Sequence, residues 1–158
     1  ALFADGLSGR DFANGKQMFA AGRCVAGLRF GGEGGYAGPD LGSLGNRYAI
    51  PDILLAICEP SRSISEQYQA SEVTLKDGGT RYGRLIFRDE RELAIAMSPF
   101  DLGRLTKIAL ADVASIAPSQ VSMMPEATIA AMNRDEVMDL IAYLVSGGDK
   151  KHAVFRPR

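Results

Sequence analysis

Residues 11–28 read DFANGKQMFAAGRCVAGL, and this stretch decides how the first part of the chain folds. Asp11 is a favoured N-cap residue and predicts a helix over 12–22. One face of that helix carries two aromatic residues and a glycine: Phe12, Gly15 and Phe19. The stretch therefore predicts an amphipathic helix, followed closely by the isolated thiol of Cys24.

Cys24 begins an incomplete motif for covalent haem attachment. Such a site reads Cys-x-x-Cys-His, because two thiols add to the haem vinyl groups and the next imidazole ligates the iron. Here Gly27 stands where the second cysteine would be, and Leu28 stands where the histidine would be. Glycine has no thiol and leucine has no lone pair, so neither the second thioether nor the proximal iron bond forms.

Composition narrows the class of protein. The 158 residues, 46% of them hydrophobic and 23% charged, are enough for one domain or for one domain with an insertion. A net charge of -1 provides no field that attracts nucleic acid or anionic lipid. No apolar run approaches the roughly 20 residues of a membrane-spanning helix. The chain begins at Ala1, which fits either a removed export signal or a trimmed sequence.

Two further helices are predicted. Pro51 begins a helix that continues to Cys58, and Glu59-Pro60 ends it, because a residue before proline disfavours the helical region. Asn133 caps the last helix, with a glutamate three residues on as in a capping box. The apolar residues of the last helix follow the helical period: Val137, Leu140, Ile141, Leu144 and Val145.

Two segments between the helices differ in character. Residues 29–47 contain seven glycines, a density that predicts no regular structure and fits either a flexible loop or backbone wrapped closely around something. Residues 68–117 alternate with period two and contain an Asp77-Gly78-Gly79 turn, which predicts short antiparallel strands. These strands form a small sheet or a partly closed barrel.

Taken in order, these motifs resemble a class I cytochrome c. The similarity is closest to the haem-binding domain of the Pirellula/Verrucomicrobium type, often found at the end of large exported dehydrogenase-like proteins. The motifs that carry the resemblance are Gly15-x-x-x-Phe19, Gly38-Pro39-Asp40-Leu41, Glu59-Pro60-Ser61, Leu75-Lys76-Asp77-Gly78, Val121-Ser122-Met123-Met124-Pro125 and Asp139 to Leu144.

The resemblance implies an α+β fold, in which a three-helix cytochrome c-like lobe holds an inserted small antiparallel β-sheet or barrel. The lobe comprises 9–67 and 118–148, the insertion comprises 68–117, and 149–158 is a solvated or loosely docked tail. It further implies single-electron transfer in the periplasm or another exported location.

The resemblance also implies a ligand set for haem. Met124 is the distal iron ligand, and the Pro39 carbonyl accepts the N–H of the proximal imidazole. Leu28 has no N–H to donate, and the sole histidine, His152, lies in the charged tail. Cys24 is therefore a solitary haem anchor, a buried inert thiol, or one half of a disulfide with Cys58.

Two functions follow, and no cofactor is expected with these residues. The first is a haem-free structural or interaction module, in which apolar Leu28 helps to fill the core. The alternative is an electron-transfer domain that keeps haem c through Cys24 and Met124. Either function involves a redox or scaffold protein partner, or fusion to a larger exported protein. The chain has no Ser-His-Asp arrangement and no second histidine for a metal site, so no enzyme is predicted.

Overall fold

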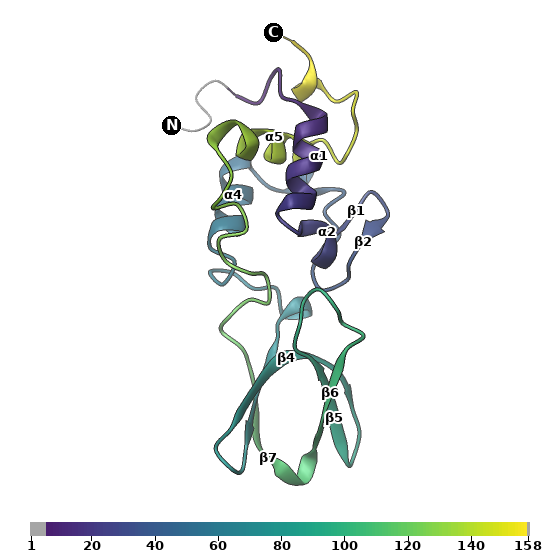
Figure 1. Ribbon diagram of the computed structural model, residues 1–158, viewed down its shortest axis with the longest axis vertical. Helices are drawn as coiled ribbons and strands as arrows, with labels where there is room; N and C mark the ends of the chain where they lie inside the picture. The colour runs from purple at the N-terminus through teal and green to yellow at the C-terminus, as the bar shows by residue number, and fades with distance from the viewer. Residues whose placement is uncertain (1–5, 158) are drawn as a thin grey trace. The chain divides into compact units, whose positions relative to one another are not determined.

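The computed structural model describes residues 6–157 and has an α+β fold (Figure 1). The chain forms two compact units, one of the described residues up to Glu59 and from Glu126 onward, the other Pro60–Pro125. The second unit is thus longer at each end than the predicted 68–117 insertion. Its flanks are held to its own residues, because Ser119 N donates to Ala70 O at 2.8 Å and Ser122 N donates to Ser61 Oγ at 3.0 Å.

The first unit contains the helices α1 (Phe12–Ala21), α4 (Ile50–Cys58) and α5 (Arg134–Val145), together with the short α2 (Cys24–Gly27) and α3 (Leu44–Arg47). The predicted caps are present. Asp11 accepts a hydrogen bond from Asn14 N at 3.0 Å, and Asn133 and Glu136 form a complete capping box. No helix among the described residues has the length and apolar character needed to cross a membrane.

Helices α1 and α5 pack directly against each other, and Gly15 lies at their crossing. A Cβ built on Gly15 would stand 2.8 Å from Tyr143 Cβ and 2.9 Å from Asp139 C, and would overlap the Asp139 carbonyl oxygen. Aromatic rings extend this contact, with the Phe12 and Tyr143 centroids 5.3 Å apart and the Phe19 and Tyr143 centroids 5.7 Å apart. The small residue on α1 therefore sets how closely the two helices approach.

The tail belongs to the first unit and is attached to the start of the described chain. Gly9 N donates to Arg156 O at 3.0 Å, Arg10 N donates to Val154 O at 3.1 Å, and the Phe12 and Phe155 rings meet edge to face. Backbone pairing and an aromatic contact thus dock this tail, which the sequence predicted to be either solvated or loosely docked.

The glycine-rich segment contains more regular structure than predicted. Strands β1 (Arg29–Phe30) and β2 (Glu33–Gly34) form a two-residue hairpin. Gly31 and Gly32 occupy its turn with φ of 61° and 84°, values that side chains disfavour. The expectation of no regular structure was wrong, because adjacent glycines favour this tight turn.

The second unit is a five-stranded antiparallel sheet in the order β6-β5-β4-β3-β7. The strands are β3 (Ser71–Leu75), β4 (Thr80–Arg88), β5 (Glu92–Ala96), β6 (Leu105–Ala109) and β7 (Val113–Pro118). Its buried core is aliphatic: Val73, Leu93, Ile95 and Ile108. Among the described residues, β6 and β7 are the two edge strands of the sheet, and no hydrogen-bonded ladder joins them. The five strands therefore do not form a closed barrel.

Candidate functional site

The site predicted from the sequence is built around α2, which follows α1 after a short turn. Gly22 ends α1, and Arg23 takes the left-handed conformation at φ 57°, so the helix is interrupted before Cys24. Leu28 N donates to Cys24 O at 2.8 Å and completes the single helical turn. The residues of the incomplete haem motif therefore lie on one short, hydrogen-bonded turn.

The glycine-rich segment encloses this turn. Gly35 N donates to Val25 O and Gly38 N donates to Gly27 O, each at 2.9 Å. A Cβ on Gly34 would lie 2.9 Å from Val25 O, and one on Gly35 would lie 2.8 Å from Ala26 C. The glycine-rich segment is therefore not a loose surface loop here, because its backbone packs closely around α2.

Leu28 fills space inside this enclosure. Its side chain is half-buried and packs against the core of the first unit. A Cβ on Gly38 would overlap Leu28 Cδ2, so the leucine lies directly against the backbone that precedes Pro39. An apolar side chain thus occupies the surroundings in which the motif would place an imidazole.

Cys24 is a half-buried thiol that packs against the same core. Burial raises the pKa of the Cys24 thiol, because the thiolate loses hydration there, and a hydrogen bond with its own backbone opposes the shift. Cys58 is exposed at the end of α4, and both cysteines are free thiols. No disulfide joins Cys24 and Cys58 in this structure.

The remaining candidate residues lie in different places. Pro39 is exposed in the first unit, next to Gly38 of the enclosure. Met124 is half-buried in the second unit, where its N–H donates to Ser122 Oγ at 3.1 Å. The structure thus brings Cys24, Leu28 and the segment around Pro39 together within one unit, and Met124 belongs to the other.

His152 has a local structural role. It is the N-cap of the 3-10 helix η3 (Ala153–Phe155), and its Nδ1 accepts a hydrogen bond from Val154 N at 3.3 Å. Among residues 6–157, no three or more His, Cys, Asp or Glu side chains form a group suited to a metal ion.

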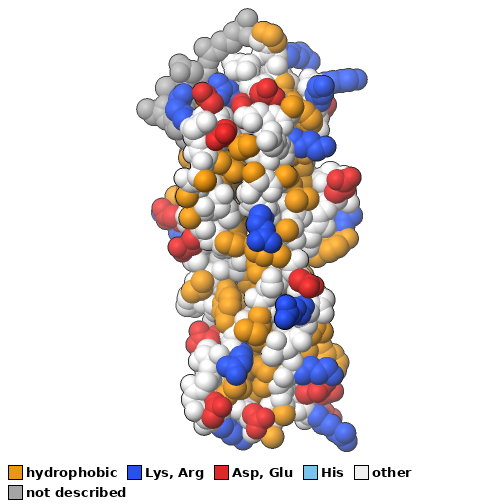
Figure 2. Space-filling model, viewed as in Figure 1, with side chains coloured by type: hydrophobic (Ala, Val, Ile, Leu, Met, Phe, Trp, Pro, Cys, Tyr) orange, Lys and Arg blue, Asp and Glu red, His pale blue; other side chains and the backbone are white. Residues whose placement is uncertain are grey.

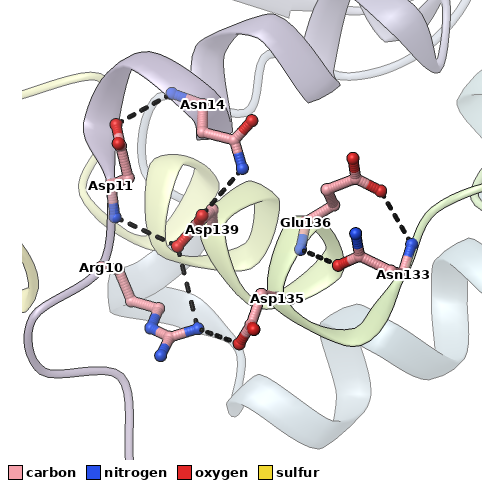
Figure 3. A network of polar contacts seen from close by, with 7 residues as sticks. All are labelled: Arg10, Asp11, Asn14, Asn133, Asp135, Glu136 and Asp139. Carbon is pink, nitrogen blue, oxygen red and sulfur yellow. Dashed lines mark hydrogen bonds and ion pairs between the residues drawn. The ribbon is translucent and has the colours of Figure 1, made fainter.

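Sequence reasoning missed a polar network that fixes α1 on α5 (Figure 3). Asp139 is buried and accepts hydrogen bonds from Asp11 N at 3.0 Å and Asn14 Nδ2 at 2.8 Å. Arg10 Nη1 lies 3.8 Å from Asp139 and 3.2 Å from Asp135. A carboxylate inside the apolar period of the last helix was the available signal, because a buried charge needs partners.

The residues around α2 do not supply two thioether bonds and a proximal iron ligand for haem. Cys24 offers one thiol, Gly27 offers none, and the Leu28 side chain has no electron pair for iron. No model of a known protein family matches the chain, and no curated protein matches it at a significant level. The geometry of α2 and its enclosure is therefore the basis for a functional proposal.

Proposed function

We propose that this chain is a cytochrome c-like module that functions without haem, as a structural or protein-interaction domain. The observation that carries the proposal is the packing of Leu28 between the core and Gly38. An apolar side chain at this position stabilises the lobe without a cofactor, because each Å² of apolar surface removed from water contributes about 25 cal/mol. An unpaired imidazole there would instead lose hydrogen bonds to water.

The enclosure around α2 supports the same proposal. The glycines at 34, 35 and 38 hold the turn through close backbone contacts that need no cofactor. The lobe has an aromatic core in which the Phe30 and Tyr143 centroids are 5.0 Å apart. Such a scaffold can present a surface without a cofactor.

The setting that we propose is an exported one, with a scaffold or redox protein as partner or with attachment to a larger exported protein. Acidic and basic side chains are interspersed on the face shown in Figure 2, in keeping with a net charge of -1. This distribution favours a protein partner over nucleic acid, because side chains of both signs on this face, with a net charge near zero, provide no strong attraction for phosphates.

Absorption spectroscopy of protein exported from a host with cytochrome c maturation tests the proposal. We expect a colourless protein whose spectrum has no Soret band. The double variant Gly27→Cys/Leu28→His restores both motif residues and shows whether the host attaches haem to this scaffold. A Soret band that survives acid-acetone extraction of the unaltered chain would overturn the proposal in favour of haem held through Cys24 and Met124.

A further inference from the structure

The first and last strands of the second unit, β3 and β7, are paired antiparallel, and the segments that connect them to the unit's boundaries continue this pairing. These segments are residues 60–70 and 119–125. Ser119 N donates to Ala70 O at 2.8 Å, and Gln69 Nε2 donates to Ser119 O at 2.9 Å. The two segments, with the hydrogen bonds between them, are called the clamp below.

The clamp extends beyond Ser119 toward the boundary of the unit. Ser122 N donates to Ser61 Oγ at 3.0 Å, which joins residues 61 positions apart in the chain. The Tyr82 hydroxyl, on β4, donates to Val121 O at 2.7 Å. The later segment is therefore bonded both to the earlier one and to a strand within the sheet.

Ser119 is the buried centre of the clamp. It is 2% exposed, and its hydroxyl both accepts a hydrogen bond from Val121 N at 3.0 Å and donates one to Val121 O at 3.1 Å. A buried hydroxyl costs free energy unless its bonding capacity is met, so this side chain favours the backbone conformation in which Val121 lies against it. The clamp should therefore loosen when the hydroxyl is removed.

The second unit also has a hydrophobic core of its own. Val73, Leu93 and Ile95, on β3 and β5, are fully buried in it. The first unit buries a separate cluster, drawn from α1, α4 and α5 among other elements. A unit that buries its apolar residues internally and fastens its own ends has what cooperative, independent unfolding requires.

We propose that the second unit is an independently cooperative module closed by the clamp. Its sheet stays folded when the first unit opens, because β3, β7 and the clamp hold its two ends together. If only the first unit held these ends, its opening would release them, and the entropy of closing a long loop would couple the two unfolding events. Such a module keeps its surface intact while the first unit opens or rearranges on meeting a partner.

Hydrogen exchange of the full chain, measured peptide by peptide by mass spectrometry where reclosing is faster than exchange, tests the proposal. Ser119→Ala should accelerate the slowest amides of β3 and β5 about tenfold, because Val121 N loses its acceptor, and should leave those of α1 and α5 unchanged. Tyr82→Phe removes only the hydroxyl that binds Val121 O and should act on the same amides. The matched control is Ser115→Ala, at an exposed serine of β7, which should change neither unit.

The reciprocal variant is Gly15→Ala, which forces α1 and α5 apart. It should accelerate the slowest amides of these two helices about thirtyfold and leave those of β3 and β5 unchanged. Acceleration of both units by one factor, in Gly15→Ala or in Ser119→Ala, would overturn the proposal by showing a single cooperative unit. Exchange in Ser119→Ala and Tyr82→Phe that matches Ser115→Ala would overturn it by showing that the clamp does not close the module.

Discussion

Gly15→Ala tests whether the close approach of α1 and α5 holds the first unit together. A new Cβ would stand 2.8 Å from Tyr143 Cβ and 2.9 Å from Asp139 C, where ordinary contacts begin at 3.4 Å. The obstructing atoms are helix backbone and a Cβ, which cannot rotate away. The two helices must therefore separate by more than half an ångström.

The cost can be worked from packing. A gap of that size forfeits about a quarter to a half of each dispersion contact across the crossing, and overpacking costs roughly 1–3 kcal/mol. Alanine recovers about 1 kcal/mol through its helix propensity. Because the clash is with backbone, we expect the overpacking cost to lie near the upper end of this range. The free energy of unfolding should therefore fall by about 2 kcal/mol.

Urea denaturation followed at the helix band of the circular dichroism spectrum measures this loss, because α1, α4 and α5 all lie in the first unit. Lys16→Ala is the matched control, since Lys16 is exposed on the same helix, and it should change stability by less than about 0.5 kcal/mol. The reasoning fails if Gly15→Ala is as stable as Lys16→Ala.

Three further predictions concern the same unit. Asp139→Ala should lower the free energy of unfolding by about 2–3 kcal/mol in urea denaturation, because it leaves the Asp11 and Asn14 N–H donors unpaired. Asp135→Ala, at an exposed residue, should cost less than about 1 kcal/mol. Equal losses would contradict the role given to Asp139. Gly34→Ala should destabilise the enclosure of α2, because φ at this residue is 105° and the new Cβ would clash with the backbone of Leu28 and Val25. Hydrogen exchange of the 24–38 amides should therefore accelerate, and unchanged exchange would refute this prediction. Burial raises the pKa of the Cys24 thiol above the ordinary 9.0, so iodoacetamide should modify exposed Cys58 first. Modification of Cys24 before Cys58 would contradict this order. Because the folded state holds the Cys24 proton more tightly than the unfolded state, the stabilisation from the buried neutral thiol is complete below pH 9.0 and declines as pH rises through the folded-state pKa. Cys24→Ala should remove this decline.

Much of the secondary structure was predictable, because local signals and tertiary structure agree. Pro51 and Glu59-Pro60 predicted α4 to within one residue of the bounds observed, and the capping box at Asn133 is complete. The alternating pattern in 68–117 predicted short antiparallel strands, and the five strands of the second unit lie there to within one residue. Such signals depend on residues a few positions apart, so they can be read without knowing which element packs against them.

The candidate site was predictable only in part. The spacing after Cys24 identified the incomplete motif, and glycine density raised the idea of close wrapping. Neither observation showed that α2 itself is the wrapped element, because that depends on hydrogen bonds between segments about ten residues apart. The exposed position of Cys58 was also missed, since a helical period locates an apolar face without saying how much of it a neighbour covers.

The sequence by itself determined the helix ends, the strand pattern and the lack of a second thiol and an imidazole beside Cys24, because these follow from side-chain chemistry and short-range spacing. Tertiary structure decided that Gly15 lets α1 approach α5, that Asp139 finds its partners on α1, and that Leu28 packs against Gly38. Each of these depends on atoms brought together by folding from positions far apart in the chain or on different turns, which no local pattern encodes.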